Sequence, residues 1–273
     1  MKTSQLVPRH GVVIRITHWI GVLAVTLLLM SGLQIFNAHP ALYWGPKSEF
    51  QRPWLAITAA PQPGGEPIGV TRLGGANFKT TGVLGWSGPP DARSALGFPG
   101  WATIPSWRDL ATGRRWHFFF AWVLVFNGLL WLAWGLFSGR IRRELVPTRA
   151  DLAPSNLRHE IVTHAKLQFP KDEKARRYNV LQKLTYLIVT LTLLPLMVAT
   201  GLAMSPGVDA GAHWLVDLFG GRQSARSIHF ICASLIVLFV LVHLAMVVAS
   251  GPWNNLRSMI TGRYRIETEG EGR

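Results

Sequence analysis

Four histidines that lie within long apolar runs are the residues of this sequence best suited to chemistry: His18, His117, His229 and His243. Ionisable side chains are costly in such segments and usually serve a function. His229 and His243 are 14 residues apart. In a helix that spacing is about 1400°, close to four full turns, and roughly 21 Å of rise. Both rings therefore face one way at two levels, and no single metal ion can join them. We expect two separate sites.

The depths of the histidines predict how they pair. His18 lies near the start of the first apolar run and His243 near the end of the last, whereas His117 and His229 each open a run. If successive helices alternate in direction, His18 meets His243 at an inner site and His117 meets His229 at an outer site. Each pair offers one neutral imidazole to each face of a haem iron, which predicts two non-covalent b haems. His213 is the alternative outer ligand.

Four apolar runs are long enough to hold these residues within a membrane, since a span needs about 20 apolar residues. We expect an all-α membrane protein, a four-transmembrane-helix haem-binding bundle that forms a single domain over residues 1–273. The predicted spans are at about 12–36, 116–137, 180–204 and 227–250.

Two long loops connect the predicted spans. The Pro-, Gly- and Trp-rich segment 37–115 is expected to be a long, irregular external loop. It would be either a docking surface for an external partner or a simple lid. Segment 139–178 is expected to be a cytoplasmic loop.

Composition and charge agree with a membrane protein. Hydrophobic residues make up 49% of the chain and charged residues only 15%. The net charge of +14 comes from basic residues in loops beside apolar runs, which indicates cytoplasmic loops and not nucleic-acid binding. We therefore expect a multi-pass protein of the bacterial cytoplasmic (inner) membrane, in contact with lipid, with an uncleaved first span and both termini cytoplasmic. The only cysteine, Cys232, excludes an internal disulfide and a CxxCH haem attachment.

Glycines and arginines near the histidines fit the same interpretation. Gly32 follows His18 by 14 residues and Gly128 follows His117 by 11, so each glycine shares a helix face with a ligand of the other site. A glycine there would let a porphyrin lie against the backbone; the alternative is ordinary close packing of helices. Three arginines adjacent to the histidines are candidate partners of haem propionates or plain interface anchors: Arg15, Arg115 and Arg226.

The motif Arg15–Trp19, together with the remaining three histidines, resembles the di-haem cytochrome b subunits of bacterial respiratory oxidoreductases, the group of formate dehydrogenase gamma subunits and nickel–iron hydrogenase cytochromes b. Within that group, Arg114–Trp122 and Arg176–Lys183 resemble the thiosulfate-reductase-type branch.

The resemblance implies transmembrane electron transfer between a quinone pool and a periplasmic catalytic oxidoreductase subunit of the molybdopterin type. It places quinone near the inner haem, where Asn179, Gln182 and Lys183 are the candidates in this sequence. The chain itself would be an electron-transfer subunit whose only substrate chemistry is at the quinone. Two alternatives remain open: a stand-alone quinone-linked haem oxidoreductase of the same fold, and a small transporter lined by histidines.

Overall fold

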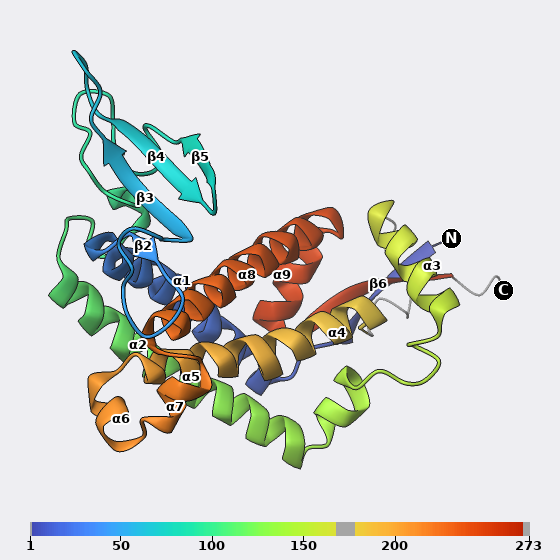
Figure 1. Cartoon of the computed structure of the whole chain (residues 1–273). Coiled ribbons are helices and arrows are strands. Elements are labelled where there is room, and N and C mark those ends of the chain that lie inside the picture. Colours follow the sequence, from blue (N-terminus) through green and yellow to red (C-terminus); the bar gives the residue numbers. More distant parts are fainter. Residues whose placement is uncertain (1, 168–177, 270–273) are drawn as a thin grey trace. The chain divides into compact units, whose positions relative to one another are not determined.

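The computed structural model describes residues 2–167 and 178–269. Within these residues, four helices are long and apolar enough to cross a membrane, which confirms the expected helical bundle (Figure 1). They are α1 (Val12–Ala38), α2 (Leu110–Phe137), the helix that runs from Val180 to Ala203, and α8 (Arg222–Ala249).

Two of the spans begin earlier than the sequence predicted. Helix α2 starts at Leu110 because Asp109 caps it: the Asp109 carboxylate accepts a hydrogen bond from the Thr112 backbone N–H at 3.0 Å. Hydrogen bonds from the backbone and the side chain of Thr112 also lower the pKa of the Asp109 carboxyl group. Helix α8 starts at Arg222, directly after two glycines with positive φ, Gly220 and Gly221.

The helix of the third span contains a proline and yet continues to its end. It consists of α4 (Val180–Ile188), a π-helical turn η4 (Val189–Leu193) and α5 (Leu194–Ala203). Pro195 lacks a backbone N–H, and its ring crowds the carbonyl four residues earlier. The wider π turn lies at that place and accommodates the ring without ending the helix.

The chain forms two compact units, and each is assembled from separate stretches of sequence. The first unit consists of Met1–Gly21, Phe126–Pro195 and Ser234–Arg273, and it contains His18 and His243. The second consists of Val22–Val125 and Leu196–Ala233, and it contains His117 and His229. Each predicted histidine pair thus belongs to one unit.

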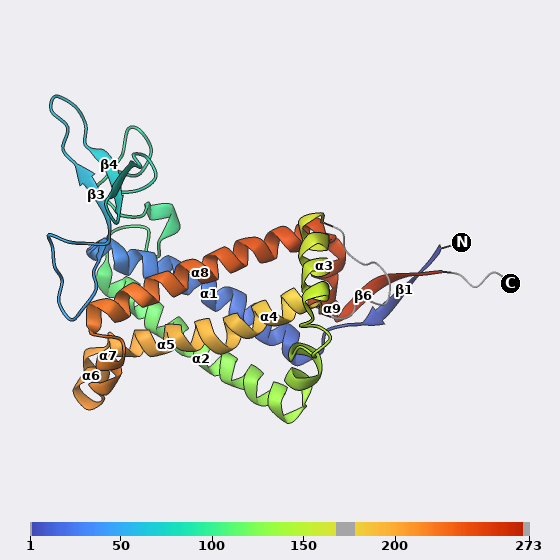
Figure 2. The ribbon, with the colours of Figure 1, turned by 45° about the vertical axis from the view of Figure 1, so that its right-hand side comes forward.

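In the first unit, β1 (Lys2–Pro8) and β6 (Arg263–Glu269) form an antiparallel pair, visible side by side in Figure 2. Val7, Tyr264 and Ile266 form a small apolar core on this ribbon. The other elements of the unit are η2 (Ile141–Leu145), α3 (Pro154–Ala165) and α9 (Pro252–Thr261). Of the resemblance motif Arg176–Lys183, residues 176 and 177 lie outside the described residues.

In the second unit, segment 37–115 contains a four-stranded antiparallel sheet, so the expectation of an irregular loop was wrong here (Figure 1). Some of the glycines and prolines form the turns between its strands: Gly74 and Gly75 alone connect the last two, and Gly74 has a φ of 57°. The strands, in spatial order, are β2 (Ala41–Leu42), β3 (Leu55–Ala60), β4 (Ile68–Leu73) and β5 (Ala76–Lys79). A short 3-10 helix, η1 (Gly100–Ala102), follows them.

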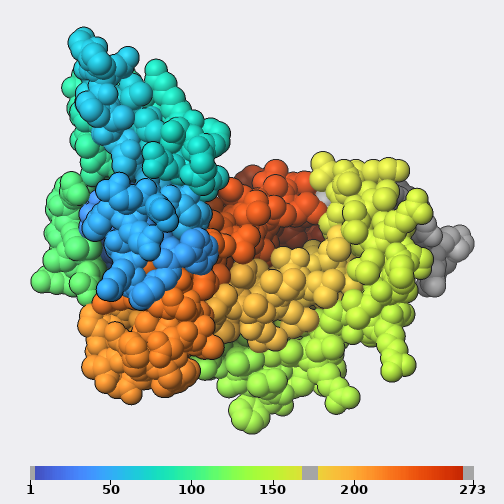
Figure 3. All heavy atoms as spheres, viewed as in Figure 1, coloured from blue at the N-terminus to red at the C-terminus, as the bar shows by residue number. Residues whose placement is uncertain are grey.

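The start of α8 fastens this sheet segment to the second unit. The backbone N–H groups of Gln223 and Ser224 donate to the Gly45 carbonyl at 3.1 and 3.2 Å. The Trp54 indole donates to the Ser227 hydroxyl at 2.9 Å. Two short helices precede α8 in the chain, α6 (Pro206–Gly211) and α7 (Trp214–Leu218). In Figure 3 the blue spheres of the sheet segment border the orange spheres of the stretch that contains α6, α7 and the start of α8.

Candidate functional site

Both predicted histidine pairs meet in the structure. In the first unit the ring centroids of His18 and His243 are 6.5 Å apart, with 57° between the ring planes. In the second unit those of His117 and His229 are 6.2 Å apart, with 59° between the planes. His213, the alternative outer ligand, is an exposed residue that pairs with Asp209 at 2.6 Å. Its bond to Asp209, aided by Asp217, raises the pKa of His213.

These distances match two imidazoles that ligate one iron from opposite sides. A metal–imidazole bond is about 2.0–2.1 Å, and about 1 Å more separates each nitrogen from its ring centroid, which gives roughly 6 Å between the centroids. Among residues 2–167 and 178–269, no three His, Cys, Asp or Glu side chains gather in a way that could hold a bare ion. A porphyrin supplies the four ligands that a histidine pair lacks, so the donor set fits haem.

The His117–His229 pair is held by two hydroxyl groups. Ser31 Oγ lies 3.1 Å from His117 Nδ1, and Thr200 Oγ1 lies 2.9 Å from His229 Nδ1. Each hydroxyl also donates within its own helix, to the Leu27 carbonyl at 2.6 Å and the Leu196 carbonyl at 2.7 Å respectively.

Those two bonds fix the protonation of both rings. A hydroxyl has one hydrogen, and a carbonyl can only accept, so each hydroxyl must accept from the ring. Nδ1 therefore carries the proton in His117 and in His229. In a neutral imidazole the other nitrogen, Nε2, then holds the free lone pair that a metal needs.

A glycine lies against each of these two rings. A Cβ added to Gly32 would lie 3.4 Å from Cε1 of His117, and one added to Gly201 would lie 3.5 Å from Cε1 of His229. The sequence placed a porphyrin against Gly32, whereas the structure places the His117 imidazole there. Gly128, the other predicted glycine, has nothing within 4 Å of an added Cβ, among the residues that the structure describes.

The His18–His243 pair has aromatic neighbours. Trp19 meets the His18 ring edge-on, at 5.3 Å between centroids, and Phe239 stacks on His243 at 5.9 Å. Nδ1 of His18 is buried and has no hydrogen-bond partner within the described part of the chain. Close to it in the same unit, burial and the charges of Arg9 and Arg140 lower the pKa of His10 to about 4.

Two of the three predicted propionate partners already bind backbone carbonyls. Arg15 donates to the Ile260 carbonyl. Arg226 donates to the carbonyls of Ala41 at 2.9 Å and His39 at 2.6 Å. Arg115 is exposed at the start of α2. The geometry thus gives Arg15 and Arg226 structural roles that the sequence did not predict.

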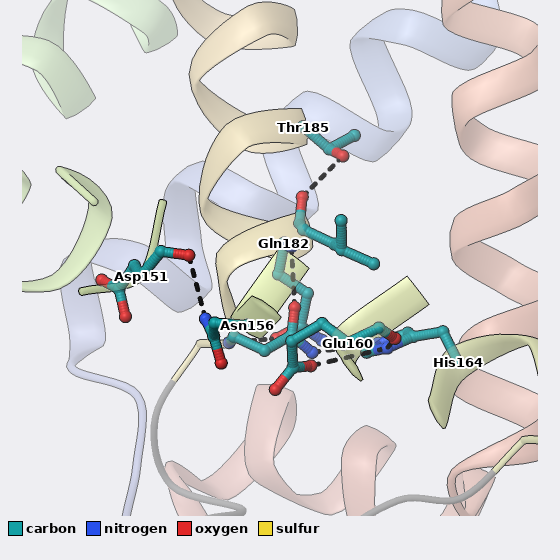
Figure 4. Close-up of polar contacts among 8 residues, drawn as sticks. Asp151, Asn156, Glu160, His164, Gln182 and Thr185 are labelled. Carbon is teal, nitrogen blue, oxygen red and sulfur yellow. Dashed lines mark hydrogen bonds and ion pairs between the residues drawn. The ribbon is translucent and has the colours of Figure 1, made fainter. Parts of the chain in front are cut away.

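The three predicted quinone residues lie at the start of α4 in the first unit, and Figure 4 shows Gln182 there, close to Glu160 and His164 of α3. Asn179 and Gln182 cap α4 reciprocally, and the Asn179 amide also lies 2.9 Å from His164 Nε2. Lys183 forms an ion pair with Asp151 at 2.8 Å, and this bond lowers the pKa of Asp151. All three side chains therefore have local partners.

Sequence reasoning missed Ser31, Thr200 and Gly201. A signal for them existed, a hydroxyl residue followed directly by glycine at Ser31-Gly32 and at Thr200-Gly201, although α2 carries the same kind of dipeptide at Thr112-Gly113. We call Ser31-Gly32 and Thr200-Gly201 the hydroxyl–glycine pairs. In each, the hydroxyl bonds one histidine ring and the glycine makes room for the same ring.

Comparison with known proteins agrees with this geometry. A sequence model described as prokaryotic cytochrome b561 matches residues 9–262, which include all four histidines. The chain is also 28% identical over 249 residues to a protein of Azospira oryzae named as a putative protein-methionine-sulfoxide reductase subunit YedZ1, with 90% of this chain and 92% of that protein covered. The chain therefore belongs to the prokaryotic cytochrome b561 family, whose members are haem-binding membrane proteins that carry electrons across the bilayer.

Proposed function

We propose that this protein carries electrons through two b haems, one held by His18 and His243 and the other by His117 and His229. The observation that carries the proposal is the matching separation of the two ring pairs, 6.5 and 6.2 Å. When bound, each haem supplies an iron that accepts and releases one electron. The protein supplies the imidazole ligands and surrounds them with apolar helix faces.

The proposed topology has both termini in the cytoplasm and segment 37–115 outside the bacterial inner membrane. The His117–His229 site is then the outer one. The sheet segment exposes large aromatic side chains, including Phe50 (73% exposed) and Trp101 (80%). Such groups are frequent in protein interfaces, so this segment is our candidate docking surface for a periplasmic catalytic subunit.

The partner is proposed to be an oxidoreductase of the molybdopterin type, as the resemblance to respiratory cytochrome b subunits implies. The relative from Azospira oryzae is named as a subunit of a putative methionine-sulfoxide reductase. A reductase partner of that class would draw electrons outward through the haems. Copurification of the chain with a coexpressed periplasmic reductase, followed by measurement of molybdenum in the complex, tests this assignment.

Quinol is the proposed electron source, bound near the inner haem at Asn179, Gln182 and Lys183. The supporting feature is a polar cluster at the start of α4 in the unit that holds His18 and His243. Lys183 has the side chain best suited to bind a quinone oxygen, since an ammonium group donates three hydrogen bonds. Its ion pair with Asp151 would then have to rearrange when quinol binds.

The decisive experiment measures haem in the purified full-length protein. Pyridine haemochrome analysis should give about two b haems per chain, and one haem per chain would overturn the two-site proposal. Duroquinol should then reduce the haems. Lys183→Met should slow that reduction, whereas Lys166→Met, an exposed lysine near the end of α3, should not. Haems that duroquinol leaves oxidised would contradict the quinol part alone.

A further inference from the structure

The two hydroxyl–glycine pairs point to residues that control one haem site and not the other. We propose that Ser31 and Thr200 are positioning residues for the axial ligands His117 and His229, and that their hydroxyls lower the reduction potential of the haem at that site. The inference rests on the proposed two-haem function.

The first step is that both hydroxyls are fixed in place. Ser31 and Thr200 have no exposed surface. Each donates to a carbonyl one turn earlier in its own helix, at 2.6 Å for Ser31 and 2.7 Å for Thr200. This back-bonding consumes the hydroxyl hydrogen. The lone pairs of the oxygen then face the ring, and the ring can only donate.

The second step is that the glycines select the ring position. Gly32 and Gly201 leave just enough room for the Cε1 side of each imidazole, at 3.4 and 3.5 Å from an added Cβ. The Nδ1 atoms lie slightly farther away, at 3.6 and 3.9 Å. A ring that is bonded at Nδ1 and packed on this side has its rotation about the Cβ–Cγ bond fixed. Its Nε2, the atom that would bind an iron, is then held in one direction.

The third step concerns the electrons. An axial histidine that donates its Nδ1 proton to an acceptor becomes a more basic ligand. A more basic ligand stabilises ferric over ferrous iron, so the haem becomes harder to reduce. In the described residues, only the His117–His229 site has such acceptors on both rings, because Nδ1 of His18 is without a partner.

The test compares variants that remove the hydroxyl with variants that keep it. Thr200→Val removes the hydroxyl at nearly constant volume, and Thr200→Ser keeps it. Ser31→Ala and Ser31→Thr form the same comparison on α1. The matched control is Thr17→Val: Thr17 is a buried residue of α1, next to His18, and among the described residues its hydroxyl bonds only to the carbonyls of Val13 and Ile14.

Potentiometric titration of the haem absorbance, on protein with its haem content measured, gives the result. Thr200→Val and Ser31→Ala should each raise the potential of one of two haems, by about 59 mV for a tenfold change in the ferric-to-ferrous preference. The second haem should not move, Thr200→Ser should restore the original potential, and Thr17→Val should change neither haem. The low-spin ferric EPR signal of the affected haem should also shift.

The outcomes separate the two proposals. A purified wild-type protein with one haem per chain contradicts the proposed function. Two haems whose potentials stay the same in Thr200→Val and Ser31→Ala contradict the positioning role only. A shift that Thr200→Ser also shows would assign the effect to packing and not to the hydroxyl, and would overturn the inference. If Thr200→Val does not accumulate, Ser31→Ala provides the same test from the other ligand.

Discussion

The two histidine pairs have nearly the same geometry in very different surroundings. Their ring separations differ by only 0.3 Å (6.5 against 6.2 Å) and their ring tilts by 2° (57° against 59°). Yet hydroxyls and glycines hold the rings of His117 and His229, whereas aromatic rings flank His18 and His243. Helix packing therefore sets the distance between two axial ligands, and the neighbours of each ring set its tautomer and orientation independently.

The largest expected effect, and the strongest test of whether the two sites are separate, is the loss of one histidine ligand. His117→Phe should remove the haem of its own site and halve the haem content of the purified protein, because a phenyl ring cannot bind iron. His18→Phe should do the same at the other site. The two variants should lose haems of different potential, since their surroundings differ. Pyridine haemochrome analysis with redox titration measures both properties. Two variants that retain the same haem would contradict the assignment of one site to each pair.

A glycine substitution should have the next largest effect, and at one site only. Gly32→Leu would drive its side chain into the His117 ring, since an added Cβ is already 3.4 Å away. We expect the haem of that site to be lost or its absorbance to become high-spin, with the other haem intact. Gly32→Ala should be much milder, because a single methyl group meets the ring at van der Waals distance without overlapping it.

Gly128→Leu is the counterpart in the first unit. An added Cβ there meets nothing within 4 Å among the described residues. If Gly128 faces a porphyrin, as the sequence predicts, leucine should displace the haem of His18 and His243. If it faces lipid, leucine should leave both haems unchanged, and absorption spectra of the purified variant distinguish the two cases.

Much of the site could be predicted because a helix converts sequence spacing directly into direction and depth. The four histidines lie in three of the four apolar runs, and the 14-residue interval between the two on α8 was sufficient to require two sites. The pairing of His18 with His243, and of His117 with His229, followed from depth alone, and the structure brings both pairs together.

The contacts made by neighbouring side chains could not be predicted in this way. Arg226 lies three residues before His229, so the sequence predicted that it would bind a haem propionate. In the structure its guanidinium group instead donates to the carbonyls of His39 and Ala41, which are distant in sequence. The sheet in segment 37–115 was missed for a related reason. Its Pro- and Gly-rich turns dominate the composition, while its strands are short and lack strict alternation of polar and apolar residues.

The role of Arg226 provides a smaller test, confined to the second unit. Arg226→Gln should lower the free energy of unfolding by about 2 kcal/mol, because two backbone carbonyls lose a charged donor. Haem content should stay the same. Thermal unfolding followed by tryptophan fluorescence measures the loss, and Arg115→Gln, at an exposed position, is the control. Wild-type stability combined with a shifted haem potential would instead favour the propionate role predicted from the sequence.

The last expected effect is a pH dependence that belongs to the first unit. Burial, together with Arg9, Arg140, His18 and Arg15, lowers the pKa of His10 from 6.5 to about 4. Between these values the unfolded chain binds a proton at His10 that the folded chain does not. Stability is therefore full above about pH 6.5 and declines as the pH falls toward 4. We expect the apparent melting temperature to fall by a few degrees over this window.

His10→Gln should flatten this decline because it removes the proton that only the unfolded chain binds. The difference between variant and wild type isolates His10 from the other groups that titrate in the same range. His159→Gln, at an exposed position of α3, should leave the slope as in the wild type. Melting curves recorded from pH 4 to 8 supply the comparison. A slope that His10→Gln leaves unchanged would mean that the pKa of His10 is not lowered in the folded protein. Water would then reach this side chain in the first unit, beside His18.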